Sequence, residues 1–108
     1  MMSALPCTAP PYAVLLTRTA EQAQKRLDKP LRLKLLEALQ ALAHSPHTLG
    51  EALKQPLTGV RSHHIKYKGL EWRIAYQVDE AAQRVLILLI GPHENFYRSL
   101  KQRWDAWL

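Results

Sequence analysis

The pattern of apolar and polar residues predicts a strand and two consecutive helices in the first half of the chain. Residues 12–17 are almost wholly apolar, as in a strand covered on both faces. Thr19 is expected to open the first helix, because a glutamine three residues later gives the spacing of a capping box. Pro30 suits the first turn of the second helix, since its missing N–H would have no partner there. Apolar residues then recur at helical spacing until Ser45 and Pro46 end the pattern: Leu31, Leu35, Ala38, Leu39 and Leu42.

The second half of the chain is predicted to form three strands and a last helix. Residues 60–67 and 71–78 form two strands joined by a turn at residues 68–70. The second of these strands alternates apolar and polar residues, which predicts one face in the core and the other in water. Residues 85–90 are apolar throughout, so we expect this strand to be central in the sheet. Asn95 can cap the last helix, whose apolar positions are Phe96, Leu100, Trp104 and Trp107.

These elements predict an α+β fold in the order β-α-α-β-β-β-α. Residues 47–59, with two glycines and one proline, are interpreted as a connecting loop. Residues 1–11 are rich in proline and lack periodicity, so we expect a flexible tail. A chain of 108 residues can bury one modest core but not two, which predicts a single domain over residues 12–108.

Composition and charge indicate a soluble protein with an anionic partner. Apolar residues make up 47% of the chain and charged residues 22%, values typical of a globular domain and not of a disordered one. Fifteen Lys and Arg against nine Asp and Glu give a formal net charge of +6, which favours nucleic acid, an acidic protein or a membrane surface. The single cysteine, Cys7, excludes an internal disulfide, and we see no convincing metal site. The longest apolar run is too short to span a bilayer, so we expect a cytoplasmic protein.

Basic side chains on the two hairpin strands form the first part of a candidate site. Side chains alternate along a strand, so His64 and Lys66 share a face, and Arg73 lies on the non-core face of the next strand. A two-residue turn at residues 69–70 would place Lys66 directly opposite Arg73, a pairing that costs up to about 1 kcal/mol. Such a pair is suited to bind an anion. The alternative is that Glu71 neutralises both cations in a solvated patch.

His93 and Tyr97 extend the candidate site beyond the end of the apolar strand, where loops often carry function. An imidazole titrates near neutral pH, so His93 can move protons, and the phenol of Tyr97 can orient or donate to a ligand. Lys66 and Arg73 can offset the charge of a pentacoordinate phosphate. Each residue alone also has an ordinary explanation, because loop histidines are often merely exposed and Tyr97 can be a helix-packing residue.

Four segments in register resemble toxins of the RelE/ParE superfamily. No single segment is diagnostic, and the resemblance rests on their order and spacing over about residues 12–104. The segments are residues 53–59 (LKQPLTG), 64–66 (HIK), 72–78 (WRIAYQV) and 90–97 (IGPHENFY).

The resemblance implies a compact, mostly antiparallel sheet, with the helical hairpin on one face and an active concavity on the other. It also implies the toxin of a type II toxin–antitoxin system, in the branch that includes RelE and YafQ. Such a toxin cleaves messenger RNA at the ribosome, without a metal or a small-molecule cofactor, and so inhibits translation. An acidic antitoxin that folds on binding would neutralise it.

The resemblance also assigns expected roles. In the ribonuclease branch, basic residues on the hairpin strands hold the scissile phosphate, which matches Lys66 and Arg73. An aromatic residue after the last strand stacks on or orients the nucleotide, which matches Tyr97. This sequence has His64 where RelE has a lysine and His93 where RelE has an arginine, while YafQ-like relatives place histidines at similar points. We therefore expect His93 to act as acid or base and His64 as its counterpart, with the assignment between them open.

Three alternatives remain. A ParE-like toxin would inhibit DNA gyrase by binding it, although that branch generally lacks the full set of candidate catalytic residues. A general nucleic-acid-binding module could use the net charge together with Trp72, Tyr67 and Tyr97. Against it, Trp72 belongs to the core-facing set, and the basic residues are spread over several elements. An inactive relative would keep the fold without turnover. Of the other histidines, His63 points to the opposite face, and His44 and His47 flank the end of a helix.

Overall fold

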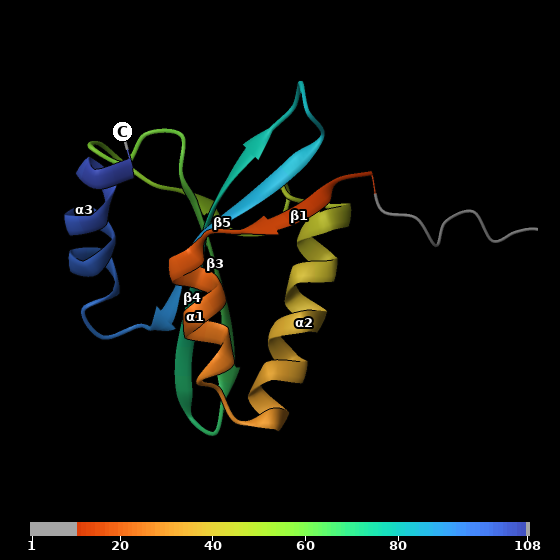
Figure 1. Ribbon diagram of the computed structural model, residues 1–108, viewed down its shortest axis with the longest axis vertical. Coiled ribbons are helices and arrows are strands. Elements are labelled where there is room, and N and C mark those ends of the chain that lie inside the picture. The colour runs from red at the N-terminus through yellow and green to blue at the C-terminus, as the bar shows by residue number, and fades with distance from the viewer. Residues whose placement is uncertain (1–10, 108) are drawn as a thin grey trace, which may run out of the picture.

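The computed structural model describes residues 11–107, which form one five-stranded sheet and three helices (Figure 1). The helices are α1 (Arg18–Lys25), α2 (Lys29–His44) and α3 (Phe96–Trp107), and the strands are β1 (Ala13–Leu16), β2 (Glu51–Ala52), β3 (Arg61–Tyr67), β4 (Leu70–Asp79) and β5 (Arg84–Pro92). The strand order is β1-β5-β4-β3-β2. β1 runs parallel to β5, and the other neighbouring strands pair antiparallel.

This architecture confirms the predicted α+β class and the mostly antiparallel sheet. The apolar strand β5 lies inside the sheet, between β1 and β4, as its composition predicted. The short strand β2 was missed, because it lies within residues 47–59, where glycine and proline suggested only a loop. The tail expected over residues 1–11 lies outside the described residues except for its last position, so that expectation stays a prediction.

The start of α1 is set by a threonine that is bonded to the sheet. The Thr17 hydroxyl accepts a hydrogen bond from the Ala20 N–H at 3.1 Å and donates to the Leu88 carbonyl at 2.9 Å. The prediction that Thr19 opens this helix was therefore wrong, because Thr17 already satisfies the free N–H at its end. Asp28 caps α2 in the same manner.

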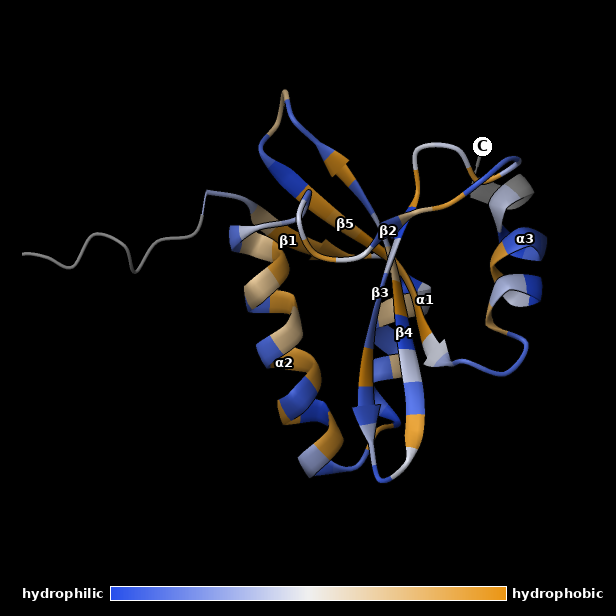
Figure 2. Cartoon of the chain, turned by 180° about the vertical axis from the view of Figure 1, so that it is seen from behind, coloured by the Kyte–Doolittle hydropathy of each residue, from blue (hydrophilic) through white to orange (hydrophobic). Residues whose placement is uncertain are grey.

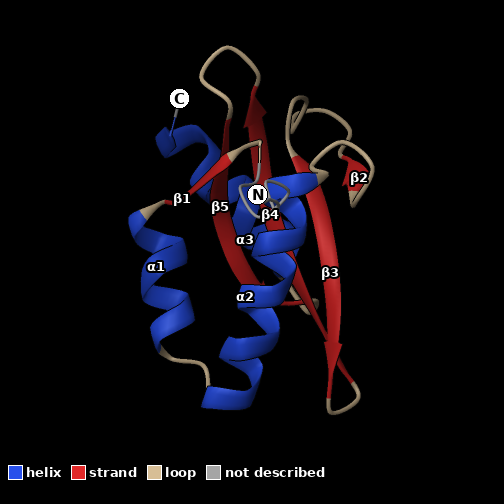
Figure 3. Cartoon of the chain, turned by 90° about the vertical axis from the view of Figure 1, so that its right-hand side faces the viewer, coloured by secondary structure: helices blue, strands red, loops and turns tan. Residues whose placement is uncertain are grey.

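One face of the sheet packs against the pair of helices α1 and α2, which lie side by side in Figure 3. In Figure 2, α2 shows alternating orange and blue segments, the colouring of a helix with one apolar side. Burial of each large aliphatic side chain contributes about 1.5–3 kcal/mol, so this layer is a major source of stability. The buried residues of the layer are Ala20, Leu35, Ala38, Leu39, Leu42, Ile74, Tyr76, Val85, Ile87 and Ile90.

The alternation in β4 predicted that the other face of the sheet is exposed to solvent, but part of this face is buried. The helix α3 lies across the sheet from α2 (Figure 1) and closes a second apolar cluster. A register shift beside Ala75 leaves it opposite Leu89 while the next residue of β4 pairs with Ile87, so both Leu88 and Leu89 join this cluster. Its buried residues are Leu57, Val60, Ala75, Leu88, Leu89, Phe96 and Leu100. This cluster positions the start of α3 beside the end of β5.

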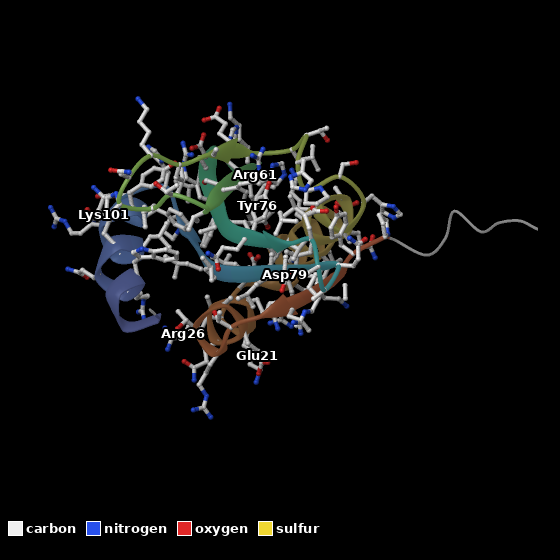
Figure 4. The ribbon with its side chains drawn as sticks, turned by 90° about the horizontal axis from the view of Figure 1, so that it is seen from above. Glu21, Arg26, Arg61, Tyr76, Asp79 and Lys101 are labelled. Atoms are coloured by element: carbon white, nitrogen blue, oxygen red, sulfur yellow. The ribbon has the colours of Figure 1, made fainter. Side chains whose placement is uncertain are left out.

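The side chains of Arg61 and Tyr76 bind the loop after α2 to the sheet through hydrogen bonds to its carbonyls. Figure 4 shows the two labels next to each other. The buried Tyr76 hydroxyl lies 2.8 Å from the Pro46 carbonyl and 2.7 Å from the Leu49 carbonyl. The Arg61 Nε donates to the same hydroxyl at 3.3 Å, and its Nη2 donates to three loop carbonyls. Burial raises the pKa of Tyr76, and this effect outweighs the opposing hydrogen bond and charge of Arg61.

Candidate functional site

The turn between β3 and β4 determines which side chains face each other. Lys68 and Gly69 have φ angles of 52° and 79°. Two consecutive left-handed residues form the tight turn that suits the twist of a hairpin, and glycine adopts that conformation at little cost. A turn one residue later would force Leu70 into the left-handed region. The two-residue turn therefore falls at residues 68–69 and not at 69–70.

This turn changes the predicted pairing of the basic side chains. His64 lies opposite Arg73, and Lys66 lies opposite Glu71. The prediction that Lys66 faces Arg73 was wrong by two residues, and the expected repulsion is replaced by a pairing of opposite charges. All four residues still share one face of the hairpin, because side chains directly opposite each other point the same way.

Arg73 is the centre of the site and bonds to three other side chains. Its Nε donates to His93 Nδ1 at 2.8 Å, and its Nη1 donates to the Tyr97 hydroxyl at 2.8 Å. Its Nη2 lies 2.6 Å from Glu71 Oε2. The guanidinium also lies over the Tyr97 ring, 5.3 Å from the centroid. Residues from β4, from the loop after β5 and from α3 are thus joined at a single cation.

The loop after β5 is fixed to β4 where it presents the imidazole. The N–H of His93 donates to the Glu71 carbonyl at 2.8 Å, and the His93 carbonyl accepts from the Phe96 N–H at 3.1 Å. Asn95, with φ of 61°, turns the chain directly into α3. Asparagine tolerates this left-handed conformation better than most residues. The His93 side chain remains 58% exposed, so a ligand can reach it.

Tyr97 is held in place by its neighbour on α3. Phe96 is buried in the second apolar cluster, and its ring meets that of Tyr97 edge-on with centroids 5.6 Å apart. Tyr97 accepts a hydrogen bond from Arg73, so its own O–H remains available as a donor. The expectation that Tyr97 can be a packing residue is partly correct, because it also contacts this cluster.

Glu71 is a member of the site whose ion pair with Arg73 agrees with the predicted neutralising role, while its contact with His93 was not predicted. Its carboxylate is 27% exposed, bonds to Arg73 and lies 3.4 Å from His93 Nδ1. The sequence had suggested only a neutralising role in a solvated patch. Its position two residues before Arg73 on the same strand face was the available signal.

The other two predicted residues are placed at the margin of the site. His64 and Lys66 are exposed on the same face of β3, and each is opposite a member of the cluster. The centroids of the His63 and His64 rings are 6.3 Å apart, and the ring planes are inclined by 30°. The structure brings Arg73, His93 and Tyr97 into direct contact and places His64 and Lys66 on the strand beside them.

The remaining histidines lie elsewhere. His63 points toward the opposite face, paired with Ile74, and burial lowers its pKa, with the charge of His64 adding to this effect. His47 is paired with Glu80, and this hydrogen bond is the largest cause that lowers the pKa of the Glu80 carboxyl. The Tyr12 hydroxyl donates to the same carboxylate at 2.9 Å. These groups tie the start of β1 to the turn between β4 and β5.

In the cluster around Arg73, the His93 side chain is 58% exposed, whereas the Arg73 side chain is 16% exposed. A groove of about 800 Å³ is formed by β1 and α2 and shares no residue with the cluster. A smaller hollow of about 220 Å³ lies next to it, between the end of β5 and α3, and is lined by Gly91, Pro92, Glu94, Phe96 and Arg103 among others. The active concavity that the resemblance implies stays a prediction.

Two further observations concern the described part of the chain. Within it, no group of three or more His, Cys, Asp or Glu side chains gathers as a metal site would require. No helix among residues 11–107 combines the length and the apolar character needed to cross a membrane.

Known proteins that this chain resembles in sequence and fold include toxins of toxin–antitoxin systems. Residues 14–101 match the family described as ParE-like toxin of type II bacterial toxin–antitoxin system. The chain is 32% identical to Toxin RelE of Mycobacterium tuberculosis over 89 residues, which covers 82% of this chain and 88% of that toxin. It is also similar to a chain of the crystal structure of the toxin–antitoxin complex RelBE2 from Mycobacterium tuberculosis, with a TM-score of 0.69, 25% identity, and coverage of 77% of this chain and 99% of that chain. The fold matches that of a mutant of E. coli toxin RelE in the free state, with a TM-score of 0.70, 19% identity, and coverage of 85% of this chain and 96% of that chain.

Proposed function

Because this chain belongs to the RelE/ParE family of type II toxin–antitoxin toxins, we propose that it is an endoribonuclease that cleaves messenger RNA and inhibits translation. The observation that carries the proposal is the contact of one guanidinium with an imidazole and a phenol, at 2.8 Å each. A cation, a proton carrier and a hydroxyl donor in contact with one another through Arg73, with the imidazole exposed, are the groups that phosphodiester transfer needs.

The proposed reaction is the attack of a ribose 2′-hydroxyl on the adjacent phosphate. A bond forms between the 2′-oxygen and phosphorus, and the bond from phosphorus to the 5′-oxygen breaks. The fragments then carry a 2′,3′-cyclic phosphate and a 5′-hydroxyl. A base removes the 2′ proton, an acid protonates the leaving 5′-oxygen, and the reaction as written requires no metal ion.

The site residues supply these roles. Arg73 and Lys66 offset the charge on the phosphate as it becomes pentacoordinate. His93 is the acid or the base, and His64 on the neighbouring strand is its counterpart. Tyr97 stacks on the nucleotide or donates its free O–H to a phosphate oxygen.

The proposed partner in the cell is an acidic antitoxin protein. The net charge of +6 favours an acidic segment that orders itself on binding. A structural neighbour of this chain comes from the crystal structure of the toxin–antitoxin complex RelBE2 of Mycobacterium tuberculosis, which supports such a partner here. Free toxin would act on messenger RNA in the ribosome, in the cytoplasm.

Induced expression followed by mapping of messenger-RNA 5′ ends tests the proposal. Cuts at fixed positions within codons, lost in Arg73→Ala, are the expected result. Arg98→Ala is the matched control, because Arg98 is an exposed arginine next to Tyr97 and its removal makes the same change in charge. Absence of new 5′ ends, together with DNA-damage signalling, would contradict the proposal and indicate gyrase inhibition instead.

A further inference from the structure

Arg73 and Glu71 compete for one nitrogen of His93. The Arg73 Nε–H donates to His93 Nδ1 at 2.8 Å, and Glu71 Oε2 lies 3.4 Å from the same nitrogen. A guanidinium can only donate, and a carboxylate can only accept. Nδ1 therefore carries no proton while it accepts from Arg73, and it must carry one to bond to Glu71.

The arrangement with Arg73 is unsuited to proton transfer. With Nδ1 unprotonated, the neutral ring of His93 has its proton on Nε2. As a base, the ring needs a proton on Nδ1 and a lone pair on Nε2. As an acid, it needs protons on both nitrogens. Both working forms have the proton on Nδ1, and both are compatible with Glu71 and incompatible with the bond from Arg73.

We propose that Glu71 is the positioning residue of His93 and that the substrate phosphate switches His93 into its working form. An anionic phosphate draws the Arg73 guanidinium away from Nδ1, and the Glu71 carboxylate then accepts the Nδ1–H. The Nδ1 proton comes from solvent, and when His93 is to serve as base its Nε2 proton returns to solvent. The proposal rests on the proposed function, because it assigns substrate control to that same site.

The local geometry allows this exchange with little movement. The backbone bond from the His93 N–H to the Glu71 carbonyl keeps the two side chains adjacent whatever Arg73 does. Arg73 also bonds to Tyr97, so the guanidinium has a contact to pivot about. When it moves, Glu71 loses its partner at 2.6 Å and is free to turn to the imidazole.

The charged and titratable groups around His93 come from three elements. Glu71 and Arg73 face it from β4, and Tyr97 joins from α3 through Arg73. His64 and Lys66 lie on the same face of β3, opposite Arg73 and Glu71. Of these groups, Glu71 alone is an anion, so it is the group able to stabilise a protonated imidazole.

A Glu71→Gln variant separates this role from simple neutralisation, because the two predict opposite changes in rate. If Glu71 only competed with the phosphate for Arg73, losing its charge would tighten RNA binding and leave kcat unchanged or raised. If Glu71 orients and stabilises His93, kcat falls while KM stays constant or decreases. We expect kcat to fall about 10- to 100-fold, the usual effect of removing an orienting partner.

The kinetic test measures cleavage of a short messenger RNA by purified toxin with ribosomes present, across pH. Glu94→Gln is the matched control, since Glu94 is exposed next to His93 and its replacement makes the same change in charge. The parent and the control should share one pH profile. In Glu71→Gln, kcat should be lower than in the parent and the control at every pH of the profile. A kcat equal to or above that of the parent would overturn the proposal.

A spectroscopic test does not depend on cleavage. Long-range ¹H–¹⁵N correlations identify which ring nitrogen of His93 carries the proton, with His93→Ala used for assignment. We expect the proton on Nε2 in free toxin at pH 8, and on Nδ1 after addition of an uncleavable 2′-deoxy oligonucleotide. A proton on Nδ1 in the free toxin, or no change in the bound one, would overturn the proposal. The expected change of tautomer in a toxin that cleaves no RNA would overturn the proposed function alone.

Discussion

The described part of the chain contains two arginine–tyrosine pairs that differ in their other partners, Arg61 with Tyr76 and Arg73 with Tyr97. Arg61 gives its Nη2 donor to three backbone carbonyls and its Nε to a buried hydroxyl. Arg73 gives its donors to an imidazole, a phenol and a carboxylate, none of them backbone. The first pair has static partners, and the second has partners that can exchange protons or swing toward a ligand.

The difference shows that partner type, more than residue type, separates a structural arginine from a functional one. A backbone carbonyl cannot leave its donor without disturbing the chain, so the contacts of Arg61 contribute to stability. A side-chain acceptor can be replaced by a phosphate oxygen, so the contacts of Arg73 maintain a site until a ligand arrives. Burial agrees with this division, because Tyr76 is fully buried and Tyr97 is only half-buried.

Arg73→Ala should have the largest effect. We expect RNA cleavage to fall about 100- to 1000-fold, as when one preorganised donor to a developing charge is removed. The folded state should persist, because the apolar clusters on both faces of the sheet do not depend on this side chain. Cleavage assays with circular dichroism on the same samples test this, and cleavage near the parent rate would show that Arg73 is not in the reaction.

Arg61→Ala should show the reverse pattern. Loss of its donors leaves the carbonyls of His47 and Gly50 without this partner and removes one of the two donors to the Leu49 carbonyl, which should lower the free energy of unfolding by about 2 kcal/mol. Activity per folded molecule should be nearly unchanged. Urea unfolding gives the first quantity and titration of active molecules the second. A strong loss of activity without loss of stability would break the comparison.

The two tyrosines should differ when each loses only its hydroxyl. Tyr76→Phe leaves the Pro46 carbonyl without its side-chain donor, while the Leu49 carbonyl keeps its bond from Arg61, so we expect a loss of about 1 kcal/mol. Tyr97→Phe should leave the midpoint of urea unfolding unchanged and reduce cleavage severalfold. Equal effects of the two substitutions on stability would contradict the division between the pairs.

The smallest expected effect concerns His63, on the opposite face from the site. Burial lowers the pKa of His63 in the folded state below its ordinary value, with the charge of His64 adding to this. The unfolded chain therefore binds the proton more readily, and the related stability is present above about pH 6.5 and lost as pH falls below it. Between pH 7.5 and 5.5, His63→Asn should lose less stability than the parent, by under about 1 kcal/mol. An identical slope in both proteins would contradict this account.

Much of the fold could be predicted from the sequence, because strong periodicity reports directly on burial. Leu31 to Leu42 marked the long helix, and the apolar run of β5 marked an interior strand. The starts of elements were less predictable. Thr17 caps α1 because it is bonded to Leu88, a contact between residues 71 positions apart that local spacing does not contain.

The candidate site was predictable in its members and less so in its pairing. Alternation along the strands placed the basic residues on one face, and the position of His93 after β5 placed it near Arg73. The exact partners depended on a turn placed by two left-handed residues, Lys68 and Gly69. Glu71 was interpreted only as a neutralising charge, because its contact with His93 depends on how the loop after β5 returns to β4.

The central claim is that the groups around Arg73 and His93 promote attack of the ribose 2′-oxygen on the adjacent phosphate. The chemical ends of the RNA fragments test this claim most directly. Fragments made by the purified toxin in a bacterial translation extract should carry 5′-hydroxyl and 2′,3′-cyclic phosphate ends, and His93→Ala should nearly abolish them. Fragments with 5′-phosphate ends, or undiminished cutting by His93→Ala, would contradict the account.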